Sequence, residues 1–306
     1  MNLPEYAYFR GEVRRYKDVQ LGLLTHALNY GTGAFAGVRA YKNEENGKLF
    51  LFRPLDHYKR FLNSAKLLLM DFDETPESMT QHTVDLLKKS GYTEDVYIRP
   101  LAFISEELIG VKLHDVQADF SIVAVPFGKY VSNDTNAHVT ISSWRRLDDN
   151  SIPARGKISG AYVSSAFIKT DAVRSGFDEA LVLTVDGHLS EGSAENLFMV
   201  RDNVLYTPSV TENILEGITR RSIMEVAEKE LGMKVVERPI DRTEAYICDE
   251  LFMTGTAAQV TAITKVDHRP VGSGEMGPVA SKLRELFFGI VRGQNPDYAH
   301  WNYEVK

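Results

Sequence analysis

The stretch ARGKISGAYVSS, residues 154–165, places one lysine among glycines, serines and alanines. Lysines usually lie on solvated, charge-rich faces, so Lys157 in this setting requires an explanation. Small neighbours leave room for a flat ring beside the amine, and a desolvated lysine can form a Schiff base with an aldehyde. A loop lysine without a catalytic role is the commoner case. The stretch therefore marks a candidate that the rest of the chain has to support.

The composition is that of an ordinary globular protein. The chain has 306 residues, enough for one large domain or two modest ones with a sizeable core. Its net charge of −7 argues against nucleic acid or an anionic membrane as the main partner. The single cysteine, Cys248, excludes an intramolecular disulfide and fits a reducing compartment. The N-terminus lacks the apolar core of a signal peptide, and no apolar run is long enough for a membrane helix. We therefore expect a cytoplasmic protein.

The first part of the chain predicts a small α+β domain over residues 1–127. The segment KLFLFRPLDHYKRFLNSAKLLLM reads as a strand followed by a helix, with Pro54 suited to the first helical turn. DVYIRPLAF and DFSIVAVPF predict two further strands. The polar, turn-rich segment GKYVSNDTN, residues 128–136, is interpreted as the interdomain loop.

The second part predicts a larger α+β domain over residues 137–306. EALVLTVDGHLSEG has the pattern of a hairpin, because Asp-Gly favours the tight turn that strand twist requires. GAYVSSAFIKTDAVRSG predicts a helix that ends near Gly176. The remaining predicted elements are, in order, strands in AHVTISS, ENLFMV and NVLYTP, a helix in ITRRSIMEVAEKELGM, a strand in KVVERPI, a strand pair in ELFMTGTAAQVTAITKV and a helix in ASKLRELFFGIVRG. The expected fold class is thus α+β, with two domains and mixed sheets.

Two further segments carry groups that suit a phosphorylated ring. In SEGSAENLF, residues 190–198, a buried Glu191 would keep a proton on a ring nitrogen, whereas a solvated turn glutamate is the plainer alternative. In NILEGITRRS, residues 213–222, a helix starts at Ile218 and Thr219. Free amides at a helix N-terminus suit phosphate, although an ordinary helix start is equally compatible with this sequence.

A turn and two arginines complete the candidates. Gly255 and Thr256 lie in TGTAAQV, where backbone amides of a tight turn would meet a carboxylate or phosphate. Arg60 and Arg99 carry forked donors for the same anions, although surface salt bridges are the usual fate of arginine. The eight histidines show no metal-ligand spacing, so we expect no metal site.

Taken together and in order, these segments resemble the class IV (fold type IV) pyridoxal-phosphate aminotransferases, most closely the branched-chain amino acid aminotransferases. The resemblance covers essentially the whole chain. It is carried by NYGTGAFAGVRAY (29–41), HYKRFLNSAK (57–66), YIRP (97–100), IPARGKISGAYVSS (152–165), DGHLSEGSAENLF (186–198), ILEGITR (214–220) and FMTGTAAQV (252–260).

The resemblance implies pyridoxal 5'-phosphate as cofactor and a role for each matching residue. Lys157 resembles the lysine that forms the Schiff base and then shuttles the substrate proton. Glu191 matches the carboxylate paired with the pyridine nitrogen, and Tyr162 matches the tyrosine that bonds the ring 3-oxygen. The other implied cofactor contacts are Arg60, Asn196, Leu215, Ile218, Thr219, Gly255 and Thr256.

The resemblance also implies the substrates and the assembly. Thr256 and Ala257 match a turn whose amides meet the substrate carboxylate, and Tyr97 and Arg99 match polar residues near it. Positions where the family lines its substrate pocket, some of them from a neighbouring subunit, are Tyr30, Phe35, Gly37 and Tyr130. The implied reaction transfers the amino group of L-leucine, L-isoleucine or L-valine to 2-oxoglutarate, in a homodimer or higher homo-oligomer.

The chain departs from the family pattern at Ala36, where a glutamate is usual between Phe35 and Gly37. The loss removes a charge and an acceptor near the pocket wall and near Arg39. This departure keeps open a relative that uses D-amino acids or (R)-amines. A lyase such as aminodeoxychorismate lyase shares the fold and the lysine, but YIRP and GTAAQV weigh against it. A non-catalytic binding protein is disfavoured by Lys157, Glu191 and Tyr162 occurring together.

Overall fold

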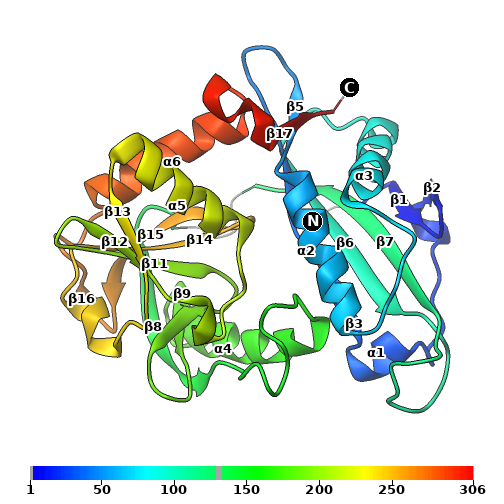
Figure 1. The fold of residues 1–306 in the computed structure, drawn as a ribbon, viewed down its shortest axis with the longest axis horizontal. Helices are drawn as coiled ribbons and strands as arrows, with labels where there is room; N and C mark the ends of the chain where they lie inside the picture. Colours follow the sequence, from blue (N-terminus) through cyan, green and yellow to red (C-terminus); the bar gives the residue numbers. More distant parts are fainter. Residues whose placement is uncertain (1–2, 129–132, 306) are drawn as a thin grey trace. The chain divides into compact units, whose positions relative to one another are not determined.

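A computed structural model describes residues 3–128 and 133–305 of the chain. The chain divides into two compact units (Figure 1): Met1–Gly128, Gly156–Gly160 and Gly289–Lys306 form the first, and Lys129–Arg155 and Ala161–Phe288 form the second. This division differs from the expected one, because residues 156–160 and 289–306 belong to the first unit. Hydrogen bonds explain the difference: the Phe35 N–H donates to the carbonyl of Lys157 (2.9 Å), and β17 at the C-terminus pairs with β5.

The first unit is built on one sheet. Its strands are β1 (Tyr6–Phe9), β2 (Glu12–Arg15), β3 (Gly33–Phe35), β4 (Val38–Lys42), β5 (Leu49–Phe52), β6 (Val96–Ile104), β7 (Ala118–Pro126) and β17 (Asn302–Glu304). They follow the order β17-β5-β4-β6-β7-β1-β2, with β3 paired to β6. The pairs described in this sheet are antiparallel.

Two long helices pack on the sheet of the first unit. They are α2 (Pro54–Leu67) and α3 (Pro76–Ser90), which also contact each other (Figure 1). Pro54 stands in the first turn of α2, as predicted, and the chain enters that helix through Arg53 in the left-handed conformation. The shorter helical segments are η1 (Tyr16–Asp18), α1 (His26–Tyr30) and η5 (Pro296–Trp301).

The second unit contains a mixed sheet. Its strands are β8 (Ala137–Arg145), β9 (Glu179–Leu183), β10 (Leu189–Gly192), β11 (Asn196–Arg201), β12 (Val204–Thr207), β13 (Lys234–Glu237), β14 (Glu250–Gly255), β15 (Gln259–Val266) and β16 (Arg269–Pro270). Their order is β10-β9-β8-β15-β14-β11-β12-β13, with β16 paired to β15. The pairs β8–β9, β8–β15 and β12–β13 are parallel, and the other pairs described here are antiparallel. The predicted α+β class is confirmed.

Helices of the second unit pack on different parts of this sheet. Helix α4 (Tyr162–Arg174) contacts β8 and β9, and α5 (Ile218–Leu231) contacts β13 and β14. The second unit also contains η3 (Val210–Glu212) and η4 (Arg242–Tyr246), while η2 (Ser159–Ala161) and α6 (Pro278–Val291) each include residues of both units. Cys248 lies in the apolar core, where burial raises the pKa of its thiol to about 12. In the described part of the chain, no helix has the length and apolarity needed to cross a membrane.

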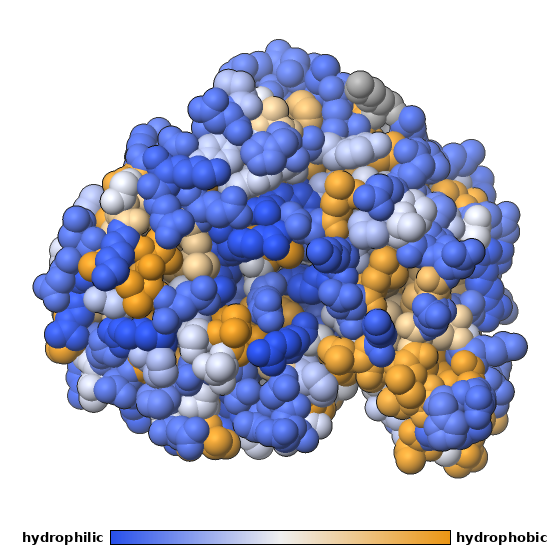
Figure 2. Space-filling view, in the orientation of Figure 1, coloured by the Kyte–Doolittle hydropathy of each residue, from blue (hydrophilic) through white to orange (hydrophobic). Residues whose placement is uncertain are grey.

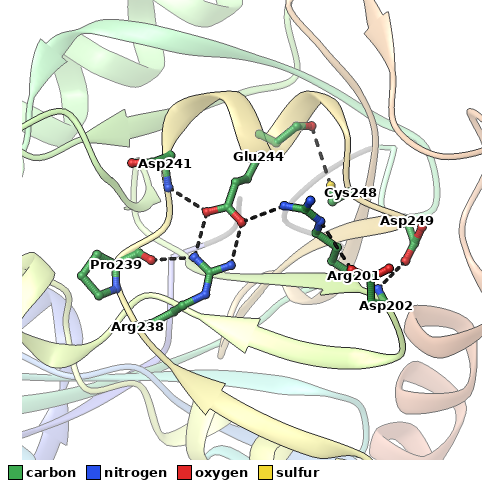
Figure 3. Close-up of polar contacts among 9 residues, drawn as sticks. Arg201, Asp202, Arg238, Pro239, Asp241, Glu244, Cys248 and Asp249 are labelled. Atoms are coloured by element: carbon green, nitrogen blue, oxygen red, sulfur yellow. Dashed lines mark hydrogen bonds and ion pairs between the residues drawn. The ribbon is translucent and has the colours of Figure 1, made fainter.

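A carboxylate on η4 ties three segments of the second unit together (Figure 3). Glu244 accepts a fork of two hydrogen bonds from Arg238 (2.8 and 2.6 Å) and a third from Arg201 (3.3 Å). Its carboxylate also accepts the N–H of Asp241 (3.0 Å), which completes a capping box at the start of η4. Hydrogen bonds from Arg238, the largest favourable contribution, hold the pKa of Glu244 below its usual range.

Replacing this carboxylate is expected to destabilise the second unit in a pH-dependent way. The folded-state pKa of Glu244 is depressed, so its stabilisation is present above the unfolded pKa and is lost as pH falls through the folded pKa. Glu244→Gln should lower the free energy of unfolding by about 1–3 kcal/mol at pH 7, and by less below pH 4. Urea unfolding at both pH values measures this. Glu285→Gln, which removes an exposed pair with Lys282, is the control, and equal effects of the two variants would contradict the prediction.

Candidate active site

Glu191 lies in β10 beside an irregularity in strand pairing. The register between β9 and β10 shifts between Leu189 and Glu191. Such bulges redirect side chains and are frequent next to active sites. Glu191 is only 4% exposed, so its carboxylate needs donors inside the protein.

Three groups of the second unit supply these donors. Arg146 Nη2 lies 2.8 Å from Glu191 Oε1. Oε2 accepts hydrogen bonds from Asn196 Nδ2 (3.0 Å) and from the N–H of Leu215 (3.1 Å). Asn196 Nδ2 also donates to the carbonyl of Leu215 (2.8 Å). The structure thus brings together three residues that the sequence singled out, and the donors favour the ionised carboxylate. Arg146 was missed, because it stands directly after β8 with no motif around it.

The N-terminus of α5 follows this cluster. Gly217 is the N-cap and gives no side-chain cap to the helix. A Cβ at Gly217 would lie 2.0 Å from Asn196 Oδ1, so glycine is required for the close approach. Ile218 and Thr219 open the helix, and its first turn holds no acidic residue. Amides of an uncapped helix start, together with the Thr219 hydroxyl, are suited to an anion.

The remaining candidates of the second unit stand at element boundaries. Tyr162 is the first residue of α4 and is half-buried. Gly255 ends β14, and the half-buried Thr256 and Ala257 form the turn before β15. The turn closes at Gln259, which adopts a left-handed conformation with φ +59°. Gly255 lies near Ala194, whose carbonyl oxygen would be 4.0 Å from a Cβ at this glycine.

In the first unit, Lys157 lies against an aromatic ring. Its Nζ is 5.0 Å from the centroid of the Phe35 ring, and the Lys157 carbonyl accepts the N–H of Phe35. The guanidinium of Arg99 is 4.6 Å from the same ring centroid, and its Nη2 donates to the Tyr97 hydroxyl (3.1 Å). Four residues predicted from the sequence thus form one cluster. The cluster combines an amine, a guanidinium and a phenol around an apolar ring.

Ser64 of α2 connects two other predicted residues through their backbones. Its hydroxyl donates to the carbonyl of Arg60 (2.9 Å) and accepts the N–H of Lys157 (3.2 Å). Ser64 is 1% exposed, so this link is shielded from water. No pattern in the sequence indicated this link, since a serine on the apolar side of a helix looks like a tolerated core residue.

Gly37 leaves room for the side chain of Tyr97. A Cβ at Gly37 would lie 2.2 Å from the Tyr97 hydroxyl oxygen. The two residues belong to neighbouring segments of the sheet, since Arg39 of β4 pairs with Tyr97 of β6. The Tyr97 side chain therefore occupies the space that a larger residue at position 37 would need.

Tyr30 and Tyr130 are the two other residues predicted to line the substrate pocket. Tyr30 ends α1, is 38% exposed, and its hydroxyl accepts the N–H of Gly110 (3.1 Å). Tyr130 lies outside the described residues.

Ala36, the departure from the family pattern, is 1% exposed. Arg39 is buried as well, and its Nη2 donates to the carbonyls of Phe127 (2.8 Å) and Gly128 (3.0 Å). Its guanidinium lies 5.3 Å from the Tyr41 ring centroid. Within residues 3–128 and 133–305, the Nε and Nη1 of Arg39 have no hydrogen-bond partner. Carbonyl oxygens and aromatic faces thus surround the guanidinium of Arg39.

Glu195, in the turn between β10 and β11, is a second buried carboxyl group. Burial and the neighbouring Glu179 raise the pKa of Glu195 to about 8. Its Oε2 accepts the N–H of Ala194 (3.1 Å). Glu179 is fully buried too, and its Oε2 lies 2.7 Å from Lys169 Nζ. A carboxyl group with this pKa is mostly protonated at neutral pH.

The raised pKa of Glu195 predicts that stability declines as pH rises. A raised folded-state pKa gives stability that is present below the unfolded value, near 4.5, and lost as pH rises toward about 8. Glu195→Gln removes this titration. Thermal unfolding of the cofactor-free protein should be similar for both proteins at pH 5, and at pH 9 the variant should be more stable by on the order of a few kcal/mol. The exposed Glu228→Gln is the control, and parallel pH curves for wild type and Glu195→Gln would refute the prediction.

The chemistry of the second unit fits a ring that carries a phosphate. A buried, ionised carboxylate suits a protonated ring nitrogen, and the uncapped start of α5 with Thr219 suits the phosphate. Among the residues that the structure describes, no group of three or more His, Cys, Asp or Glu side chains is placed to hold a metal ion.

The chain is similar to known proteins along nearly its whole length. Residues 33–266 match the family model described as Amino-transferase class IV. A protein of Aquifex aeolicus named "Probable branched-chain-amino-acid aminotransferase" is 42% identical over 297 residues, covering 97% of this chain and 96% of the relative. The branched-chain-amino-acid aminotransferase of Escherichia coli K12 is 37% identical over 305 residues, covering 98% and 97%.

Solved structures give the same result. The branched-chain amino acid aminotransferase of Thermobaculum terrenum in its PLP form has a TM-score of 0.95 at 32% identity, with 100% of both chains covered. The branched-chain aminotransferase of Thermoproteus uzoniensis, solved with norvaline, has a TM-score of 0.94 at 37% identity, with 98% of this chain and 99% of that chain covered. These matches confirm the family and the fold that the motifs predicted. The chain belongs to the class IV aminotransferases and, within them, to the branched-chain-amino-acid aminotransferases.

Proposed function

We propose that the protein transfers the amino group of L-leucine, L-isoleucine or L-valine to 2-oxoglutarate with pyridoxal 5'-phosphate as cofactor. Nearly full-length similarity to branched-chain-amino-acid aminotransferases supports this. The observation that carries the proposal is the position of Lys157 against Phe35, in one cluster with Tyr97 and Arg99. When bound, the cofactor supplies an aldehyde that joins amines covalently and a pyridine ring that withdraws electrons.

The residues of the second unit are assigned to holding the cofactor. Glu191 keeps a proton at the ring nitrogen, and Tyr162 bonds the ring 3-oxygen. Thr219, at the start of α5, binds the phosphate. The other proposed cofactor contacts are Arg60, Asn196, Leu215, Ile218, Gly255 and Thr256.

Lys157 is assigned to covalent attachment and proton transfer. Its amine would hold the cofactor covalently, and as a free amine it would take the Cα proton of the donor. Tyr97 and Arg99, with the turn at Thr256 and Ala257, are assigned to the substrate carboxylate. The proposed walls of the substrate pocket are Tyr30, Phe35, Gly37 and Tyr130.

Ala36 supports a second candidate, transamination of D-amino acids or (R)-amines. Ala36 carries no charge, and two N–H groups of the buried Arg39 have no hydrogen-bond partner in the described part of the chain. Such a change near the pocket wall would alter which face of a donor is accepted.

An absorbance spectrum with single donors tests the proposal. Purified protein loaded with the cofactor is expected to show a visible band that L-leucine and L-valine bleach, while D-alanine and an (R)-amine leave it unchanged. Bleaching by D-alanine or the (R)-amine alone would instead establish the second candidate. A loaded protein without any visible band would refute the assignment of Lys157.

We further propose a homodimer or higher homo-oligomer in the cytoplasm. A set of exposed apolar residues around α1, called here the α1 patch, supports self-association; its members are Leu21, Leu23, Leu24, Leu28, Ile109 and Val111. Figure 2 shows apolar residues gathered at the lower right, over the region of α1. Exposed apolar patches commonly mark interfaces, and homo-oligomers are the commonest assemblies. A single cysteine is compatible with a reducing compartment.

Charges placed in the α1 patch are expected to dissociate the assembly. Leu23 and Ile109 are each 84% exposed, so substitution leaves the interior of the unit intact. The double variant Leu23→Lys, Ile109→Lys should elute as a monomer in size-exclusion chromatography with light scattering, where wild type elutes as an oligomer. Val185→Lys, at a position 64% exposed in the second unit, is the control. An unchanged mass for the double variant would argue against this interface.

A further inference from the structure

Arg146 is held at two points besides its contact with Glu191. Its Nε donates to the carbonyl of Asn213 (2.8 Å), while its backbone N–H donates to the carbonyl of Leu183 (2.9 Å). Its side chain is 18% exposed and that of Glu191 is 4% exposed. The guanidinium therefore joins a backbone carbonyl, through Nε, to a buried carboxylate, through Nη2 of the same planar group.

Asn213 provides its carbonyl from an unusual backbone conformation. It follows η3 with φ +57° and ψ +32°, in the left-handed region. Its side chain is anchored on both sides: Oδ1 accepts the N–H of Asp149 (3.3 Å) and Nδ2 donates to Asp148 Oδ2 (3.3 Å). Asparagine tolerates this conformation better than most residues. The turn thus sets the position of the Asn213 carbonyl oxygen, which accepts the hydrogen bond from Arg146 Nε.

The two oxygens of Glu191 have different partners. Oε1 contacts Arg146, and Oε2 contacts Asn196 and the N–H of Leu215. Donors on both oxygens determine the rotation of the carboxylate plane as well as its charge. Without the guanidinium, Oε1 would lose this charged neighbour while the neutral donors on Oε2 remained.

We propose that Arg146 is a positioning residue that sets the rotation and the ionised state of Glu191, and that the left-handed Asn213 positions Arg146. This inference rests on the proposed function, in which Glu191 meets the ring nitrogen of the cofactor. In this proposal Arg146 acts through Glu191 and is assigned no contact of its own with substrate or cofactor. Lysine at this position would keep the charge but could not bridge the two acceptors.

The test compares four variants with wild type: Arg146→Gln, Arg146→Lys, Glu191→Gln and the double variant Arg146→Gln, Glu191→Gln. Hydrogen bonds to charged groups of this kind correspond to about a 10-fold to 100-fold change, which is the expected loss of kcat for Arg146→Gln. The dissociation constant of the cofactor should rise about tenfold, and KM for L-leucine should stay within about threefold of wild type. Arg145→Gln, at the neighbouring exposed position, is the matched control.

The double variant shows whether Arg146 acts through Glu191 or affects the structure independently of it. It should be no slower than Glu191→Gln alone, because the group through which Arg146 acts is already changed. Losses that multiply in the double variant would overturn the inference. Wild-type kcat and cofactor affinity in Arg146→Gln would overturn it too.

The conservative variants keep the test decisive if Arg146→Gln does not fold. Arg146→Lys should lose at least about fivefold in kcat, and full activity there would overturn the role of the guanidinium. Asn213→Gly keeps the left-handed backbone and should stay near wild type, whereas Asn213→Val should show a loss like that of Arg146→Lys. Equal behaviour of the two Asn213 variants would overturn the role of the turn.

Failure of the proposed function would look different. A loaded wild-type protein whose visible band is not bleached by any amino donor would refute that function. Urea unfolding of the cofactor-free proteins would still test the inference in that case. The midpoint shift caused by Glu191→Gln should be smaller in the Arg146→Gln background, and an equal shift would overturn the coupling.

Discussion

Lys157→Ala is expected to lose at least about 1,000-fold in kcat for transfer from L-leucine to 2-oxoglutarate. The reason is that one amine is assigned both to attachment of the cofactor and to proton transfer at Cα. Alanine removes both activities, while the backbone contacts of residue 157 with Phe35 and Ser64 remain available. The fold is therefore expected to survive. A coupled assay of product keto acid, with cofactor content measured by absorbance, gives the result.

The matched control for this experiment is Lys88→Ala, at an exposed position of α3. It removes a lysine of the same size from the first unit without touching the cluster around Phe35. Turnover by Lys157→Ala within about tenfold of wild type would sink the catalytic assignment.

Glu191→Gln is expected to lower kcat by about 100-fold to 1,000-fold. Glutamine keeps the size of the side chain, but a neutral amide cannot hold a proton on a ring nitrogen as a carboxylate does. The substitution also removes the ionic partner of Arg146, whose Nη2 lies 2.8 Å from Oε1. Steady-state kinetics at fixed cofactor saturation isolates the effect on kcat. The exposed Glu228→Gln on α5 is the control, and equal activities of the two variants would exclude the proposed role of Glu191.

Local sequence signals predicted most of the second unit. Asp-Gly between two apolar runs indicated the hairpin of β9 and β10, and helices were predicted in the segments that form α5 and α6. Helix α3 was not predicted, although Thr75 and Pro76 form a regular start with a capping box. The sequence also did not indicate that residues 156–160 belong to the first unit. Their place there depends on a bridge between Ala34 and Ile158, which are far apart in the sequence.

Candidate residues could be predicted from the sequence where the side chain itself suggests a reaction, as an amine or a carboxylate does. Lys157 and Glu191 stand in unusual local sequences, and the order of seven motifs along the chain made the family recognisable. Arg146, Ser64 and Asn213 have no such signal. Their roles come from contacts with residues far along the chain, which a single sequence without structure does not display.

The close approach of Gly37 and Tyr97 limits how the enzyme can be engineered toward new amines. A methyl group at position 37 would fall 2.2 Å from the Tyr97 hydroxyl, so a larger residue there requires the Tyr97 side chain to shift. Scanning position 37 alone would therefore test each larger residue together with a displaced Tyr97 side chain. A library of double variants, with a smaller residue at position 97 and a larger one at position 37, would test combinations that single substitutions do not reach.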